Sequence, residues 1–166
     1  MVLGLERLWT PWRMQYVASA EQSTGCFLCE KPREQRDAEN LILWRGERVF
    51  AILNLFPYNT GHTMVAPYAH EGDLTRLDSA IAAEMMAALQ RMVRVIGQEY
   101  RPDGFNIGMN LGRVAGAGVP DHLHIHIVPR WGGDTNFMVL TANTKVMPET
   151  LDRTYERLRA RLARDG

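Results

Sequence analysis

The sequence has only two cysteines among 166 residues and lacks any long apolar run. Two cysteines are too few for a disulfide framework, and their thiols stay reduced in the cytoplasm, where we expect the protein. No stretch of 18 or more apolar residues occurs, so we expect neither a transmembrane helix nor a membrane partner. Nineteen basic side chains balance nineteen acidic ones. The basic excess of nucleic-acid-coating proteins is therefore absent, and we expect no nucleic-acid partner.

The length and the lack of internal repeats predict a single domain over residues 1–166. Residues 1–25 form an arm with Trp9 and Trp12. We expect this arm to dock on the domain or on a second subunit, because floating tails are usually poor in aromatic residues. Residues 30–40 are mostly charged and predict a solvated loop.

Short apolar runs and alternating patterns predict five strands. The first two form a hairpin around Gly46 and Glu47, and the last two alternate strictly between apolar and polar or glycine positions. The predicted strands cover residues 41–45, 48–53, 62–67, 104–111 and 122–128.

Two helices complete the predicted fold. A long helix begins at Asp78 or Ser79. Its apolar stripe consists of Ile81, Met85, Leu89, Met92 and Ile96. A charged helix over residues 148–164 has an inner face of Leu151, Tyr155, Leu158 and Leu162. Because hairpins outnumber crossovers, we expect an α+β fold with a mainly antiparallel sheet and one long central helix.

Three histidines at alternate positions carry the most informative chemistry. His122, His124 and His126 are expected on one face of the last strand, with aliphatic residues on the other face. Core packing does not call for three neighbouring imidazoles, each of which can gain charge near neutral pH. Two functions remain open at this point. The triad alone could hold a metal, or one imidazole could act as a nucleophile while its neighbours orient or protonate the substrate.

The segment before the triad favours a phosphate ligand. Asn106 and Asn110 share one face of the preceding strand, and a loop with Gly112, Gly116 and Gly118 follows. Glycines let backbone N–H groups approach and surround an anion.

The two cysteines form a C-x-x-C pair without a surrounding βαβ pattern, which argues against thioredoxin-type redox chemistry. His70, near the end of the third predicted strand, and one member of the triad would complete a Cys₂His₂ set with Cys26 and Cys29. Such a set is typical of structural zinc, and we expect no organic cofactor.

The run HLHIHIV and the upstream segment AILNLFPYNTGHTMVAP resemble the signature of the histidine triad (HIT) family over roughly residues 26–137. This resemblance implies a HIT-like fold and a homodimer whose two sheets join into one. It also implies that a histidine attacks the α-phosphate of a nucleotide and forms a covalent nucleotidyl-histidine. His124 matches the family's nucleophile, and His122 and His126 match the flanking histidines. We expect a backbone carbonyl to hold the other ring nitrogen of His124.

The resemblance also implies substrate and metal ligands. Asn54 matches the ribose-binding residue, Asn110 matches a polar residue on the phosphate side, and His62 matches a histidine that supports the site from behind. The implied zinc ligands are Cys26, Cys29, His70 and His122. A histidine that binds zinc cannot simultaneously act as a general acid.

One departure from the family pattern concerns the loop before the triad. Many members carry a glutamine and a hydroxyl residue there, whereas this chain reads AGAGVPDH. Phosphate contacts must then come from the backbone N–H groups of Gly116, Ala117 and Gly118, or be absent. Arg130 or residues near 132–134 could add donors for an accepting phosphate, although we favour a surface or dimer role for Arg130.

Flanking segments LWTPWRM and HIVPRWGGDTNF resemble the bacterial branch that includes diadenosine tetraphosphate phosphorylases, alongside Fhit-like nucleotide hydrolases. We therefore expect cleavage of dinucleoside polyphosphates, with inorganic phosphate as the favoured acceptor. Three alternatives stay open: hydrolysis by water, a nucleoside phosphoramidase, and a nucleotide-binding module without turnover.

Overall fold

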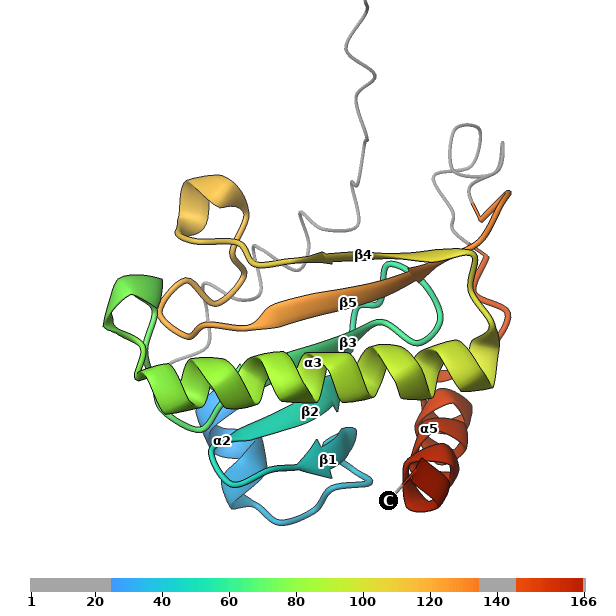
Figure 1. The fold of residues 1–166 in the computed structure, drawn as a ribbon, viewed down its shortest axis with the longest axis horizontal. Coiled ribbons are helices and arrows are strands. Elements are labelled where there is room, and N and C mark those ends of the chain that lie inside the picture. The colour runs from blue at the N-terminus through green and yellow to red at the C-terminus, as the bar shows by residue number, and fades with distance from the viewer. Residues whose placement is uncertain (1–24, 135–145, 166) are drawn as a thin grey trace, which may run out of the picture.

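The computed structural model describes residues 25–134 and 146–165, which form an α+β fold. Its centre is a five-stranded sheet in the order β1-β2-β3-β5-β4, with every neighbouring pair antiparallel (Figure 1). The expected fold class is thereby confirmed. The strands are β1 (Ile42–Arg45), β2 (Val49–Leu53), β3 (Thr63–Pro67), β4 (Gly104–Gly108) and β5 (Ile125–Arg130).

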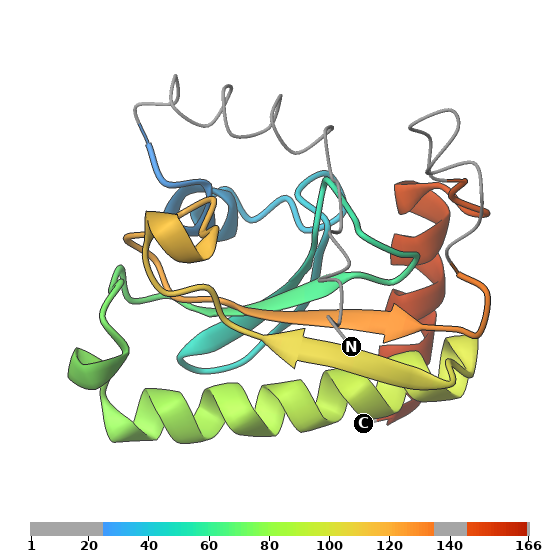
Figure 2. The same cartoon turned by 90° about the horizontal axis from the view of Figure 1, so that it is seen from above.

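Helices cover both faces of this sheet. Figure 2 shows α3 along one face, with α2 and the short helix η2 beyond the other. None of the described helices is long and apolar enough to cross a membrane. The helices are α2 (Phe27–Arg33), η1 (Leu74–Arg76), α3 (Ser79–Tyr100), η2 (Arg113–Ala115) and α5 (Leu151–Asp165).

The long helix α3 begins and packs as its sequence predicts. Asp78 is the N-cap, because its carboxylate accepts from the N–H groups of Ala80 and Ile81. Four residues of the predicted stripe are buried against the sheet: Met85, Leu89, Met92 and Ile96. The same core includes Leu158 and Leu162 of α5. Arg159 of α5 also donates to the Leu43 carbonyl of β1 at 2.8 Å.

The opposite face of the sheet holds a smaller apolar cluster. Leu28 of α2 is fully buried there, together with Ile42, Phe50, Ile52, Met64 and Ala66 of the strands. This contact anchors α2, which brings the two cysteines to the sheet. The prediction of a loop over residues 30–40 was therefore wrong for its first part, because Glu30–Arg33 belongs to a helix.

Both strands next to the glycine loop are shorter than predicted. The strand predicted over 104–111 ends at Gly108, and two of its apolar residues, Ile107 and Leu111, are each 47% exposed. The strand predicted over 122–128 begins only at Ile125. In the sheet, β4 is an edge strand that pairs with β5 alone among the described strands. The helix predicted over 148–164 spans Leu151–Asp165.

The arm over residues 1–25 lies outside the described residues except for Gly25.

Candidate active site and metal centre

Four side chains from distant parts of the sequence form one cluster with metal-ligand chemistry. Cys26 precedes α2, Cys29 lies within it, His70 follows β3, and His122 precedes β5. Their ligand atoms all lie within 4.8 Å of one another. The Nδ1 of His122 is 3.3 Å from the Cys26 Sγ and 3.4 Å from the Cys29 Sγ, and the His70 Nδ1 is 3.3 Å from the Cys29 Sγ.

These distances and the donor types fit zinc. A tetrahedral Zn²⁺ at its usual bond lengths separates a sulfur and a nitrogen ligand by about 3.6 Å. The His122 Nε2–H donates to the Pro67 carbonyl at 2.8 Å, so the lone pair lies on Nδ1, facing the sulfurs. This outer hydrogen bond is the usual support of a metal-binding histidine. Burial and the adjacent Cys26 thiol raise the pKa of Cys29, and a bound cation would deprotonate such a thiol.

His124 is held in one tautomer by the backbone. Its Nδ1 lies 2.8 Å from the His122 carbonyl oxygen, which can only accept, so Nδ1 carries the hydrogen. The lone pair is then on Nε2. The side chain is buried, and burial lowers the pKa of His124 below its ordinary value although the hydrogen bond to the carbonyl opposes the shift. The ring is accordingly a neutral imidazole at neutral pH.

His126 has the opposite tautomer, set by two groups behind it. The Tyr58 backbone N–H donates to the His62 Nδ1 at 3.1 Å, so the His62 hydrogen is on Nε2. That nitrogen lies 3.0 Å from the His126 Nδ1, which must accept. The remaining hydrogen of His126 is on Nε2. Complete burial, together with the neighbouring His126 and His124, lowers the pKa of His62 to about 3.

Comparisons with known proteins assign this arrangement to a family. A sequence model of the HIT domain matches residues 35–133. The chain belongs to the HIT family. It is 44% identical over 167 residues to the AP-4-A phosphorylase of Mycobacterium tuberculosis, covering 96% of this chain and 86% of that protein. It is also 30% identical over 129 residues to Protein hit of Bacillus subtilis, covering 76% and 88%.

Solved structures agree with this assignment. A histidine triad nucleotide-binding protein of Sulfolobus tokodaii matches with a TM-score of 0.69 and 26% identity, covering 84% of this chain and 93% of that one. A zinc-bound histidine triad protein of Mycobacterium smegmatis matches with a TM-score of 0.67 and 28% identity, covering 87% and 96%.

The histidines of this HIT triad do not form the single row that strict alternation predicts. His122 and His124 lie before β5, and the His122 ring belongs to the metal cluster. The His124 and His126 rings meet edge to face, with centroids 4.8 Å apart. A metal held by the triad alone is therefore not the arrangement found. His122 lies with the cysteines and His70, whereas His124 and His126 lie outside that cluster.

The remaining substrate residues predicted from the HIT resemblance lie in turns. The Asn54 side-chain oxygen accepts from the Phe56 N–H at 3.0 Å, which fixes the turn after β2. Asn110 donates to the Gly116 carbonyl at 3.3 Å, which closes the glycine loop. Gly116 has a φ of 88°, a left-handed conformation that favours glycine.

Two of the three backbone donors predicted in that loop are already engaged. The Gly116 N–H donates to the Arg113 carbonyl and the Ala117 N–H donates to the Gly112 carbonyl. Of the backbone N–H groups that we expected to contact phosphate, chiefly that of Gly118 is therefore left for this role.

Arg130, considered above as a donor for an accepting phosphate, is engaged in a network at the end of β5. Its guanidinium donates to both Asp134 oxygens at 2.6 and 2.9 Å and to Asn106 at 2.6 Å. Asn59 donates to the same carboxylate at 2.7 Å. Arg130 lowers the pKa of Asp134, so this ion pair persists at neutral pH. The network fixes the chain between β5 and the loop before β3.

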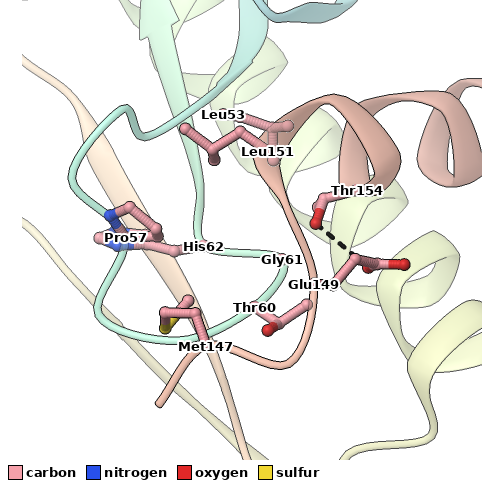
Figure 3. Close-up of a pocket in the computed structure, with 9 residues that line it drawn as sticks. All are labelled: Leu53, Pro57, Thr60, Gly61, His62, Met147, Glu149, Leu151 and Thr154. Carbon is pink, nitrogen blue, oxygen red and sulfur yellow. Dashed lines mark hydrogen bonds between the residues drawn. The ribbon is translucent and has the colours of Figure 1, made fainter. Parts of the chain in front are cut away.

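A pocket of about 120 Å³ lies behind His62 (Figure 3). Pro57 and His62 stand on one side, and Glu149 and Thr154 on the other. The Glu149 carboxylate accepts from the hydroxyls of Tyr100 and Thr154. A carboxylate in the wall repels phosphate, so this pocket is not suited to the polyphosphate of a nucleotide.

Proposed function

We propose that this HIT enzyme transfers the adenylyl group of a dinucleoside polyphosphate to inorganic phosphate through a covalent bond to His124. The substrate class is suggested by the 44% identity to a protein named AP-4-A phosphorylase. One observation carries the chemistry: the His124 Nδ1 donates to the His122 carbonyl, which leaves a neutral Nε2 lone pair. A neutral imidazole with a fixed tautomer is a suitable nucleophile at neutral pH.

In the first step the His124 Nε2 lone pair forms a bond to the α-phosphorus. The bond from that phosphorus to the bridging oxygen breaks, and its electron pair leaves on the oxygen of the departing nucleoside polyphosphate. The His122 carbonyl then stabilises the ring, which becomes positively charged when it carries the phosphoryl group. Phosphoryl transfer depends mainly on such positioning and on charge stabilisation.

The surrounding groups orient the substrate. The His126 Nε2–H donates to a phosphate oxygen, because the His62 Nε2–H occupies its other nitrogen. The Gly118 N–H supplies a backbone donor, with Gly116 and Ala117 shaping the loop. Asn54 binds the ribose, and Asn110 holds the loop against the phosphates.

The second step frees His124. A phosphate oxygen attacks the same phosphorus, the N–P bond breaks, and its electron pair returns to Nε2. Diadenosine tetraphosphate then yields ATP in the first step and ADP in the second, whereas water as acceptor yields AMP. We expect ADP when the substrate is supplied with phosphate, and chromatographic separation of the nucleotides measures it. AMP in place of ADP beside the ATP, at every phosphate concentration, would establish a hydrolase.

The Cys₂His₂ cluster binds zinc in this proposal, and the site is structural. Cys26, Cys29, His70 and His122 supply four ligands, which leaves no open position for substrate. Bound zinc supplies a cross-link there rather than a reacting group. Reduced thiols suit the cytoplasm, where we place the protein.

A homodimer completes the proposal. The edge strand β4, its exposed residue Ile107 and the exposed Leu111 beyond its end offer a surface on which a second sheet can pair. Sedimentation measurements test this: we expect twice the mass of one chain, and a monomer at micromolar concentration would contradict it.

A further inference from the structure

His62 lies just outside the sheet ladder, although its ring contacts a triad histidine within the sheet. The ladders that β3 forms with β2 and β5 end at Thr63, one residue after His62. His126, in contrast, is paired with Met64 and is fixed by the register of β5. The His62 Nε2 nevertheless lies 3.0 Å from the His126 Nδ1. The position of the His62 ring therefore depends on the turn over residues 59–62, which precedes β3 (Figure 3).

Asn59 connects this turn to the end of β5. Its carbonyl accepts from the His62 N–H at 3.1 Å, and the residue is only 5% exposed. Its side-chain amide donates to the Pro129 carbonyl at 2.9 Å and to the Asp134 Oδ2 at 2.7 Å. Pro129 belongs to the strand that carries His126. One buried side chain thus ties the turn that holds His62 to the strand that holds His126.

Close packing on β5 restricts the same turn. Gly61 has a φ of 80°, and a Cβ at this position would lie 3.3 Å from the Pro129 Cγ. The Thr63 hydroxyl donates to the Gly61 carbonyl at 3.0 Å. Because glycine adopts the left-handed conformation without strain and has no side chain, the turn can lie directly against the strand.

The carboxylate that accepts from Asn59 is itself fixed by a charged partner. Arg130 donates to both oxygens of Asp134, and the Trp131 N–H donates to the Oδ2 at 3.2 Å. The hydrogen bond from Arg130 lowers the pKa of Asp134, so this side chain stays an ionised acceptor at neutral pH. Hydrogen bonds to an ionised acceptor are stronger than those between neutral groups. Asp134 is therefore a firm anchor for the Asn59 amide.

We propose that Asn59 is a positioning residue for the triad: anchored by Asp134, it holds His62 at hydrogen-bond distance from His126. The inference rests on the proposed transfer to His124, in which the His126 Nε2–H donates to a phosphate oxygen. Asn59 does not contact the substrate in this scheme and acts only through His62. Misplacing a group that contacts the reacting atoms by about 1 Å can cost about 100-fold in rate. Because His126 matters most where charge develops on the phosphate, loss of the anchor should lower kcat more than it raises KM.

A second buried asparagine provides a matched control. Asn40, between α2 and β1, is 7% exposed, and its amide also donates to a backbone carbonyl, that of Lys31, and to a carboxylate, that of Glu34. We expect Asn59→Ala to lower kcat for diadenosine tetraphosphate with phosphate by at least about tenfold, with KM changed by less than about threefold. We expect Asn40→Ala to keep kcat within about twofold of the wild type, although calorimetry should show a lower Tm for both variants.

The two variants also define the results that contradict the inference. A folded Asn59→Ala protein with kcat within about twofold of the wild type would overturn it and leave the proposed transfer intact. Equal losses of kcat in Asn59→Ala and Asn40→Ala would show a general effect of lost stability and would overturn it as well. A wild type that turns over no dinucleoside polyphosphate would instead overturn the proposed function, and NMR of the free protein then decides the inference alone.

Proton and nitrogen NMR of the histidine rings reports the position of His62 without turnover. We expect the hydrogen between the His62 Nε2 and the His126 Nδ1 to give a downfield signal that exchanges slowly with water. This signal should be shifted or lost in Asn59→Ala and unchanged in Asn40→Ala. An unchanged signal in Asn59→Ala contradicts the inference whatever the activity of the variant.

Asp134→Asn changes the same contact from its other end and replaces Asn59→Ala if that variant does not fold. Asp103 is the matched control, because its carboxylate accepts from the Gly132 N–H at 2.6 Å and so also holds the segment after β5. We expect Asp134→Asn to lower kcat by at least about threefold and to shift the same proton signal, and Asp103→Asn to change neither. Equal kcat values and equal signals in these two variants would refute the positioning role of Asn59.

Discussion

Removal of the proposed zinc should destabilise the fold by an amount that follows from the positions of its four proposed ligands. Cys29 and His70 are 41 residues apart in the sequence, and their ligand atoms lie 3.3 Å apart. A cross-link that closes a loop of this length costs the unfolded chain about 4 kcal/mol of conformational free energy. The link to His122 closes a second, longer loop. The total stability of a domain is only about 5–15 kcal/mol, so the loss is large.

Thermal unfolding measures this loss. For a chain of this size, 1 kcal/mol corresponds to about 2–4 °C in Tm. The first loop alone therefore predicts a decrease of about 8–16 °C after treatment with a strong chelator. Residual binding of zinc to the C-x-x-C pair in the unfolded chain reduces the effect. Adding Zn²⁺ back should restore the original Tm.

The matched control is the Cys26→Ala/Cys29→Ala protein, which lacks both thiols. We expect its Tm to equal that of the chelated wild type and to be insensitive to chelator. A wild-type protein whose Tm changes by less than about 1 °C on chelation, or that contains no metal when freshly purified, would refute a structural metal at this site.

Three further predictions concern packing, pH and the acceptor side of the site. Leu158→Ala should lower the free energy of unfolding by about 2–5 kcal/mol, because this α5 side chain is fully buried. The control Leu74→Ala changes an exposed side chain and should alter the free energy of unfolding by less than about 0.5 kcal/mol. Denaturant titration measures both values. His62 has a folded pKa of about 3 against 6.5 in the unfolded chain, so the unfolded state binds more protons between these values and stability is lost as pH falls below 6.5. Between pH 6 and 4 we expect the free energy of unfolding of the wild type to fall by about 1.4 kcal/mol per pH unit more than that of His62→Gln. Denaturant titration at several pH values measures this, and parallel plots of unfolding free energy against pH for the two proteins would contradict a buried neutral His62 ring. Asp134→Asn weakens the contacts to Arg130 and Asn59. We expect a lower Tm by calorimetry and a KM for phosphate that changes less than threefold. A selective loss of activity with phosphate would instead show that Arg130 binds the accepting phosphate.

Much of the fold follows from local sequence patterns. The hairpin of β1 and β2, the Asp78 cap and the buried stripe of α3 all result from short-range rules, and the structure confirms them. Local patterns do not predict helix α2, because it has only seven residues, contains Pro32 and is charged at its end. Its stability comes from burial of Leu28 against the sheet, a tertiary contact that no local pattern reveals.

The site was predictable to the level of residue types. The C-x-x-C pair, His70 and the triad are visible in the sequence, and the structure brings the four proposed zinc ligands together. Strict alternation misplaced His122, because β5 begins only after the triad's second histidine. The Tyr58 N–H and the carbonyls of Pro67 and His122 fix the ring tautomers, yet backbone groups are present at every position and leave no sequence signal.

Mass spectrometry of the reacting enzyme tests the role of His124 most directly. The protein is mixed with diadenosine tetraphosphate in the absence of phosphate, quenched in alkali and digested. We predict one adenylyl group on the peptide that contains His124, lost when phosphate is added before the quench and absent in His124→Gln. A wild-type enzyme that turns over substrate with no adduct on this peptide, or a His124→Gln protein of undiminished activity, would contradict covalent catalysis by this imidazole.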